Sequence, residues 1–257
     1  MKEEKKREAQ VLSPEEEPME LQPLIVHLRQ LRKTVLFCMI AVTLAVIIVF
    51  LALSRHLVTF VTQPIIAKGI RVIFTDVAEG FSAQVKLSVI VGIVCASPLV
   101  FAAIWLFVRP GLKRKERKKA LIYIVAAAVL FVAGVWFAYR YVFFLAVNFF
   151  IQTGDVFAEP MLSIGTYINF LLGFLPPFGV MFELPVVIIW LTGLGLVTSQ
   201  QLRNARKFVI LGLFVIAAIL TPPDVVSQVM LGMPLLVLYE VGIVCAKVVE
   251  KKKKIDE

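Results

Sequence analysis

The sequence predicts an all-α fold: a polytopic membrane protein with six transmembrane helices, both ends of the chain in the cytoplasm, and short last two helices. Three observations predict it. Hydrophobic residues make up 60% of the 257 residues and the mean hydropathy is +0.89, whereas soluble domains contain about 45–50% apolar residues. Charged residues, 18% of the chain, cluster between long apolar stretches. Lys and Arg are concentrated in alternate segments, which indicates orientation in a membrane.

Six apolar stretches are expected to form the transmembrane helices, since a helix needs about 20 residues to cross the hydrocarbon core. The fifth has about 13 apolar residues, roughly 20 Å of helix, and Glu240 interrupts the sixth after about 24 Å. Both are shorter than a core of about 30 Å, which favours a locally thinned bilayer. The stretches run roughly over residues 34–54, 84–108, 120–148, 164–193, 208–220 and 223–246.

The net charge of +9 is explained by membrane topology. The two ends of the chain and the segments after the second and fourth stretches hold 22 of the 27 Lys and Arg residues, and the alternate segments hold four. The positive-inside rule then places both termini on the cytoplasmic side of a cell (inner or plasma) membrane. We expect anionic lipid to contact the basic loops and expect no nucleic-acid partner.

The chain is expected to form a single membrane domain over residues 21–247. Residues 1–20 mix charges and prolines, which predicts a disordered cytoplasmic tail. Residues 21–34 have the amphipathic spacing of an interfacial helix that leads into the first span. The segment 54–83 should hold short structure over the outer face of the membrane. Residues 248–257 are expected to form a basic cytoplasmic tail.

Prolines are expected to shape several helices. Pro98 should kink the second helix, with the freed backbone carbonyl satisfied by neighbouring groups or water. In the sequence TPPD, Pro222 suits the first helical position and Asp224 suits the positive end of the helix. The prolines expected to have structural roles are Pro64, Pro98, Pro185, Pro222 and Pro223.

Glu183 lies about 15 Å of helix from the Gly193 end of the fourth apolar stretch, near the middle of the bilayer, where an ionisable group is costly. One interpretation is a protonated carboxyl hydrogen-bonded to the carbonyl of Met181, because Pro185 lacks the N–H that would bond it. The interpretation we favour is a recognition or proton site.

Five other polar residues stand out, and each has a simple structural interpretation. Asp224 and Gln228 share one face of the sixth helix, as a cap with a helix-start contact would. Tyr239 and Glu240 suit the cytoplasmic interface. Glu116, the only acid between the second and third stretches, suits pairing with nearby lysines.

Enzymatic chemistry is not indicated. The sequence contains no G-x-x-x-x-G-K-[ST] phosphate loop and no hydrolase signature. His27 and His56 fall on opposite predicted sides of the membrane, so they cannot share a metal. The three cysteines lie in predicted spans without metal-ligand spacing. We therefore expect no enzyme, no cofactor and no metal.

Five motifs together resemble the TatC family, the polytopic core of the twin-arginine protein translocase. Their order and spacing match from about Leu21 to Lys247, and TPPD-x-x-SQ followed by LYE is the most specific signal. The motifs are HLRQLRK at 27–33, PGLKRKER at 110–117, FELP at 182–185, TPPDVVSQ at 221–228 and PLLVLYE at 234–240.

This resemblance implies a receptor that binds twin-arginine signal peptides of folded precursor proteins at the cytoplasmic face. It also implies an oligomeric complex with single-span TatA/TatB-type proteins, driven by the proton-motive force. In the family, the HLxELR segment and the acid of the first cytoplasmic loop recognise the arginine pair, at Gln30 and Glu116 here. The implied signal-peptide site comprises His27, Gln30, Arg32, Phe107, Pro110 and Glu116. The intramembrane polar residues implied to meet partner helices are Glu183, Asp224, Gln228, Tyr239 and Glu240.

Two positions depart from the family pattern. Gln30 stands where the family usually has Glu, which keeps a hydrogen-bond acceptor but loses the charge opposite an arginine. We hypothesise that Glu20 or the acidic run 15–17 compensates. The usual Tyr-Gln after the proline of the second span is Ala102-Ala103 here.

Two alternative functions remain open from the residues. A proton-coupled small-solute carrier could use Glu183, although carriers usually contain paired repeats, and we find no convincing internal repeat. A purely structural scaffold would need no role for Glu183.

Overall fold

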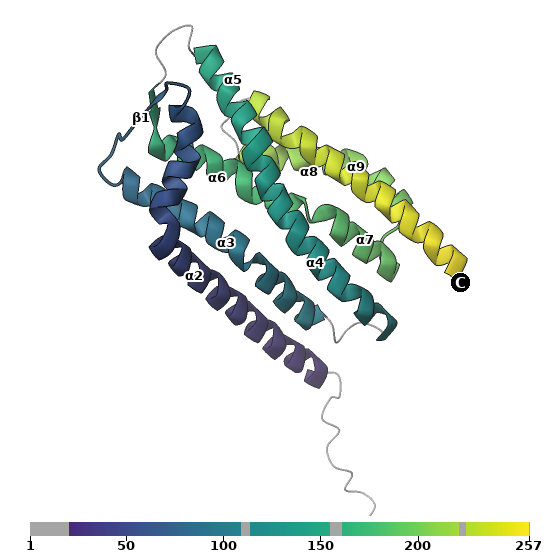
Figure 1. Ribbon diagram of the computed structural model, residues 1–257. Helices are drawn as coiled ribbons and strands as arrows, with labels where there is room; N and C mark the ends of the chain where they lie inside the picture. Colours follow the sequence, from purple (N-terminus) through teal and green to yellow (C-terminus); the bar gives the residue numbers. More distant parts are fainter. Residues whose placement is uncertain (1–20, 109–113, 155–160, 221–224, 257) are drawn as a thin grey trace, which may run out of the picture.

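The computed structural model of the protein is a bundle of long helices with one small sheet (Figure 1). It describes residues 21–108, 114–154, 161–220 and 225–256, so the predicted tail 1–20 lies outside the described residues. The elements in chain order are α2 (Leu21–Ile66), β1 (Arg71–Ile73), α3 (Glu79–Val108), α4 (Arg114–Phe137), the π-helix η2 (Ala138–Phe143), α5 (Phe144–Gly154), β2 (Met161–Ser163), α6 (Ile164–Met181), α7 (Leu184–Leu194), α8 (Ser199–Leu220) and α9 (Val225–Asp256).

The helices confirm an all-α polytopic membrane protein. Within the described ranges, five helical segments are long and apolar enough to cross a membrane. Helix α8, the expected fifth span, carries its basic residues in its first half, which leaves the short apolar stretch that was predicted. The five segments are Leu28–Ile66, Glu79–Phe107, Ile122–Gly154, Ile164–Leu194 and Val225–Lys251.

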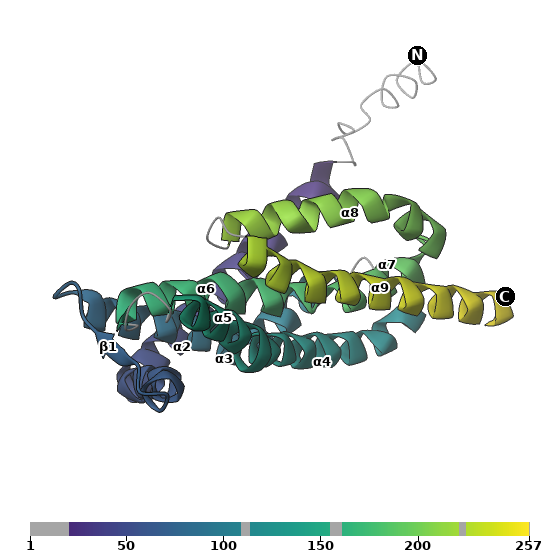
Figure 2. The same ribbon diagram turned by 90° about the horizontal axis from the view of Figure 1, so that it is seen from above.

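Helix α9 is longer than the sequence predicts. It continues through Glu240 and through most of the predicted basic tail to Asp256. Glu240 does not end the apolar segment because its carboxylate pairs with Arg206 on α8. The turns that follow Glu240 carry the exposed apolar residues Val241 and Val244. α8 lies on the outside of the bundle, beside α9 (Figure 2).

Helix α2 joins the predicted interfacial helix and the predicted first span into one helix of 46 residues. It continues through Pro64 and ends at Ile66, and the turn that follows contains Gly69, whose positive φ of 81° suits a residue without a side chain. α2 packs along α3, where Gly92 allows a close approach. A Cβ at Gly92 would lie 2.6 Å from the side chain of Val46.

The predicted short structure in the segment 54–83 is the strand β1. It pairs in parallel with β2, with Val72 opposite Leu162. We call the end of the bundle that carries these strands the strand end. The start of α2, the end of α3 and the start of α4 lie together at the opposite end (Figure 1).

Helix α3 continues through Pro98 as a single helix. Pro98 lacks the N–H that would bond the carbonyl of Val94. The hydroxyl of Ser97 donates to that carbonyl at 2.8 Å. The expectation that a neighbouring group satisfies the freed carbonyl is therefore confirmed.

The core lies where η2 and α6 meet, and it is rich in aromatic residues. Phe143 of η2 is fully buried and its ring contacts Tyr167 edge-on, with 5.2 Å between the centroids. The Tyr167 hydroxyl donates to the carbonyl of Val61 at 2.9 Å, which attaches α6 to α2. Phe174 and Phe178 complete the buried aromatic face of α6.

Candidate functional site

The residues expected to bind a signal peptide lie on elements that meet at the end opposite the strands. Gln30 and Arg32 lie in the first turns of α2, and Phe107 lies in the last turn of α3. The chain then enters α4 at Arg114 (Figure 1). Glu116 and His27 are described only by their backbone positions in α4 and α2, and Pro110 lies outside the described residues.

The surface at the start of α2 is basic and apolar together. Arg29, Arg32 and Lys33 are exposed, and so are Leu28 before them and Leu31 between them. Gln30 is half-buried, unlike its neighbours on both sides. A side chain that is only half-exposed beside a basic surface can hydrogen-bond a ligand without competing fully with water.

Glu183 lies at a break between two helices that share one membrane span. α6 ends at Met181 and α7 begins at Leu184, with Pro185 in the first turn of α7. The N–H of Val187 donates to the carbonyl of Glu183 at 2.9 Å, which starts the new helix. The break therefore follows from a proline at the position where a helix tolerates it.

The carboxyl group of Glu183 faces α4. The carboxyl group lies beside the backbone of Phe131. Its Oε1 is buried and has no hydrogen-bond partner in the described part of the chain, so this oxygen does not bond the carbonyl of Met181 as one interpretation proposed. A buried oxygen without a hydrogen-bond partner lowers stability unless another molecule satisfies it.

Two glycines bring α4 close to this carboxyl group. A Cβ at Gly134 would lie 2.7 Å from the carbonyl oxygen of Phe178, and one at Gly179 would lie 2.8 Å from the ring of Phe131. Larger residues would separate α4 from α6. The site at Glu183 thus depends on a close helix crossing that the sequence motifs did not reveal.

The polar residues predicted on the sixth helix contact α8. Gln228 Nε2 donates to the carbonyl of Phe214 at 2.9 Å, and the Tyr239 hydroxyl donates to the carbonyl of Leu202 at 2.8 Å. Tyr239 is buried, and this hydrogen bond attaches α9 to α8. Asp224, Pro222 and Pro223 lie outside the described residues, and the structure does not describe the predicted cap.

Glu240 forms an ion pair with Arg206 of α8, at 2.5 Å between Oε2 and Nη2. Further along, Glu250 accepts hydrogen bonds from both the N–H and the hydroxyl of Ser199, each at 2.6 Å, and thereby caps the start of α8. Sequence reasoning missed Arg206, Ser199 and Glu250. Their complementary chemistry becomes visible only when the antiparallel register of α8 and α9 is known.

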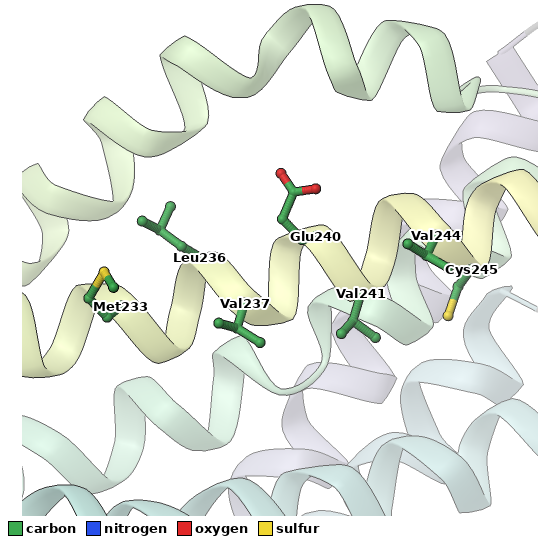
Figure 3. Close-up of a pocket in the computed structure, with 7 residues that line it drawn as sticks. All are labelled: Met233, Leu236, Val237, Glu240, Val241, Val244 and Cys245. Atoms are coloured by element: carbon green, nitrogen blue, oxygen red, sulfur yellow. The ribbon is translucent and has the colours of Figure 1, made fainter.

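One face of α9 forms a shallow hollow of about 460 Å³. Its lining is apolar except for Glu240, whose carboxylate points toward α8, while the side chains of Val237 and Val241 point away from α8 (Figure 3). The lining residues are Met233, Leu236, Val237, Glu240, Val241, Val244 and Cys245.

Comparison with known proteins identifies close relatives along nearly the whole chain. The family profile described as Sec-independent protein translocase protein (TatC) matches residues 26–234. A TatC from Carboxydothermus hydrogenoformans is 42% identical over 240 residues, which cover 93% of this chain and 97% of the relative. The TatC of Escherichia coli K12 is 37% identical over 228 residues, 86% and 87% of the two chains.

A crystal structure of a twin-arginine translocase receptor, TatC, is similar to this fold with a TM-score of 0.81 and 33% sequence identity. The match covers 87% of this chain and 99% of the crystallised one. The similarity therefore extends over the bundle as a whole.

Proposed function

Because the chain belongs to the TatC family of Sec-independent protein translocase proteins, we propose that it is the subunit that binds twin-arginine signal peptides of folded precursors. The binding surface is the end of the bundle opposite the strands. The observation that carries the proposal is the meeting of α2, α3 and α4 at that end, since it groups the positions of Gln30, Phe107 and Glu116.

In this proposal, a carboxylate of the protein recognises the guanidinium group of a signal-peptide arginine. A carboxylate such as Glu116 can form two parallel charge-assisted hydrogen bonds with one arginine, a geometry that lysine cannot reproduce. Gln30 offers an amide oxygen for the second arginine. Exposed Leu28 and Leu31 provide apolar area for the hydrophobic part of a signal peptide.

The membrane orientation in this proposal has both termini in the cytoplasm of a cell membrane. The excess of Lys and Arg in the segments that flank the end of the bundle opposite the strands supports it. The proton-motive force would drive transport, as membership of the TatC family implies.

Single-span TatA/TatB-type proteins are the proposed membrane partners, in an oligomeric complex. The apolar hollow on α9 fits a helix packed in lipid, and Glu240 at its edge fits a polar residue of such a helix. Glu183, with its unsatisfied oxygen, is a second position where a polar side chain of a partner would gain a hydrogen bond.

The test is a pull-down of the solubilised full-length protein with a peptide that contains Arg-Arg and with the same peptide containing Lys-Lys. We expect retention only of the Arg-Arg peptide, and loss of that retention in Glu116→Ala. Asp256→Ala, which removes an acid from the end of α9, is the matched control and should bind normally. Equal retention of the two peptides by the unmodified protein would reject the proposed specificity.

A further inference from the structure

A polar pocket of about 190 Å³ lies at the strand end, between the first turns of α3 and α6. α3 contributes residues from Glu79 to Lys86, α6 contributes residues from Gly165 to Asn169, and Asp76 lies in the segment before α3. None of these residues belongs to the proposed signal-peptide surface, which is at the other end of the bundle.

The basic group in this pocket is Lys86. Its ammonium donates to Asn169 Oδ1 at 2.7 Å, and no carboxylate of the described residues lies within ion-pair distance of it. Lys86 also lies inside the apolar segment Glu79–Phe107. A positive charge in a membrane-spanning segment is costly unless an anion or the membrane surface compensates it.

The acidic groups lie at the outer rim of the same pocket. The carboxylate of Glu79 accepts hydrogen bonds from the N–H and the hydroxyl of Thr75, each at 2.7 Å, and from the hydroxyl of Ser163 at 2.6 Å. These bonds fix the rim because they join the segment before α3 to the start of α6. Asp76 is exposed beside it.

The glycine at the start of α6 makes this rim compact. A Cβ at Gly165 would lie 2.7 Å from Glu79 Oε1. Lys86 lies seven residues beyond Glu79, or about 10 Å along α3. The pocket therefore presents a cation on its inner side and carboxylates on its outer side.

An apolar path continues from the inner side of the pocket. Val89 and Ile93 follow Lys86 at the i+3 and i+7 positions of α3, which is the same helix face. Both are 37% exposed and face the surroundings of the bundle. In a membrane this face is in contact with acyl chains.

We propose that this pocket binds the phosphoethanolamine headgroup of a membrane lipid from the leaflet at the strand end. The phosphate receives hydrogen bonds from Lys86 and from the hydroxyl of Thr166. The ammonium group faces Asp76 and Glu79, and the acyl chains lie along Val89 and Ile93. A zwitterionic headgroup fits because its two charges match the order of charges in the pocket, which a purely anionic headgroup would not.

Lipid titration followed by native mass spectrometry tests this proposal on the full-length protein in detergent. We expect one phosphatidylethanolamine molecule to bind, with affinity lowered about tenfold in Lys86→Gln, as for loss of a charge-assisted contact. Lys86→Arg should retain binding. Lys68→Gln removes a lysine at the same end of the bundle, where its ammonium bonds Asn148, and should bind as the unmodified protein does.

Asp76→Asn distinguishes recognition of the amine from attraction of the phosphate. It should weaken binding of phosphatidylethanolamine severalfold and leave binding of phosphatidylglycerol unchanged. Gel filtration and circular dichroism establish that each variant is folded. Equal affinity of phosphatidylethanolamine for the unmodified protein and for a folded Lys86→Gln variant would overturn the proposal.

The free headgroup separates a lipid from a soluble phosphate ester. Glycerophosphoethanolamine in hundredfold excess should not displace the lipid, because it lacks the chains that contact α3. Displacement at that concentration would assign the pocket to a soluble ligand and overturn the assignment to a lipid.

Discussion

Arg206 of α8 and Glu240 of α9 form an ion pair with 2.5 Å between Nη2 and Oε2. Glu240 directly follows Tyr239, whose hydroxyl donates to the carbonyl of Leu202. Together with the cap that Glu250 provides for Ser199, these contacts attach the first half of α8 to α9. The short apolar half of α8 is held near its other end by Gln228.

Breaking the ion pair should weaken the bundle only slightly. The Arg206 and Glu240 side chains are 44% and 49% exposed, so screening limits the loss in Arg206→Gln to about 1 kcal/mol or less. Thermal unfolding of Arg206→Glu, of Glu240→Arg and of the double variant Arg206→Glu/Glu240→Arg measures the contribution of the ion pair to stability. The exchanged pair should recover most of the lost stability, and a double variant as unstable as the sum of the single variants would contradict direct pairing.

Ser97 should stabilise α3 only because Pro98 is present. Ser97→Ala leaves the carbonyl of Val94 without a donor and should lower stability by about 1 kcal/mol. In a Pro98→Ala background the N–H of residue 98 bonds that carbonyl, so the same serine change should have little effect. A double-mutant cycle of melting temperatures tests this, and additive effects would refute the compensation.

The helical pattern of the fold could be predicted because each apolar stretch is long enough to specify a helix by itself. Contacts between distant segments could not be predicted in the same way. The pairing of Val72 with Leu162 and the ion pair of Arg206 depend on register, which no local pattern contains. Helix α9 exceeded expectation because a partner on α8 compensates Glu240, a charge that appears isolated in the sequence.

At the candidate site, too, single residues could be predicted from the sequence but contacts between distant segments could not. The motifs predicted that Glu183 is a special intramembrane acid, and the structure adds that its Oε1 has no partner in the described ranges. They could not reveal the glycine crossing that places Phe131 next to it. A glycine specifies a close approach only when the opposing helix is known.

Glu183→Leu should make the protein more stable and less active. Removing a buried oxygen without a partner recovers about 1–3 kcal/mol of desolvation, so the melting temperature should rise. Export of a twin-arginine reporter should fall, because the carboxyl group is lost as a contact for a partner helix. Normal export by this variant would rule out that role.

Thr192→Val is the matched control for this experiment. Thr192 is a buried residue of α7 whose Oγ1 also lacks a partner among the described residues. Its replacement should raise stability and leave export unchanged. A parallel loss of export in both variants would show that stiffening of α7, and not loss of the Glu183 carboxyl group, is responsible.

Gln30→Glu should strengthen binding of twin-arginine peptides. The side chain is half-buried at the end where α2, α3 and α4 meet, and a carboxylate there adds charge opposite an arginine. Titration of the solubilised protein should show Kd lowered severalfold for the Arg-Arg peptide and little changed for the Lys-Lys peptide, since the gain requires the planar guanidinium. If residues 1–20 supply the missing acid, their deletion should weaken binding in the Gln30 protein and have less effect in Gln30→Glu. Equal losses in both backgrounds would show that the acidic run acts independently of this position.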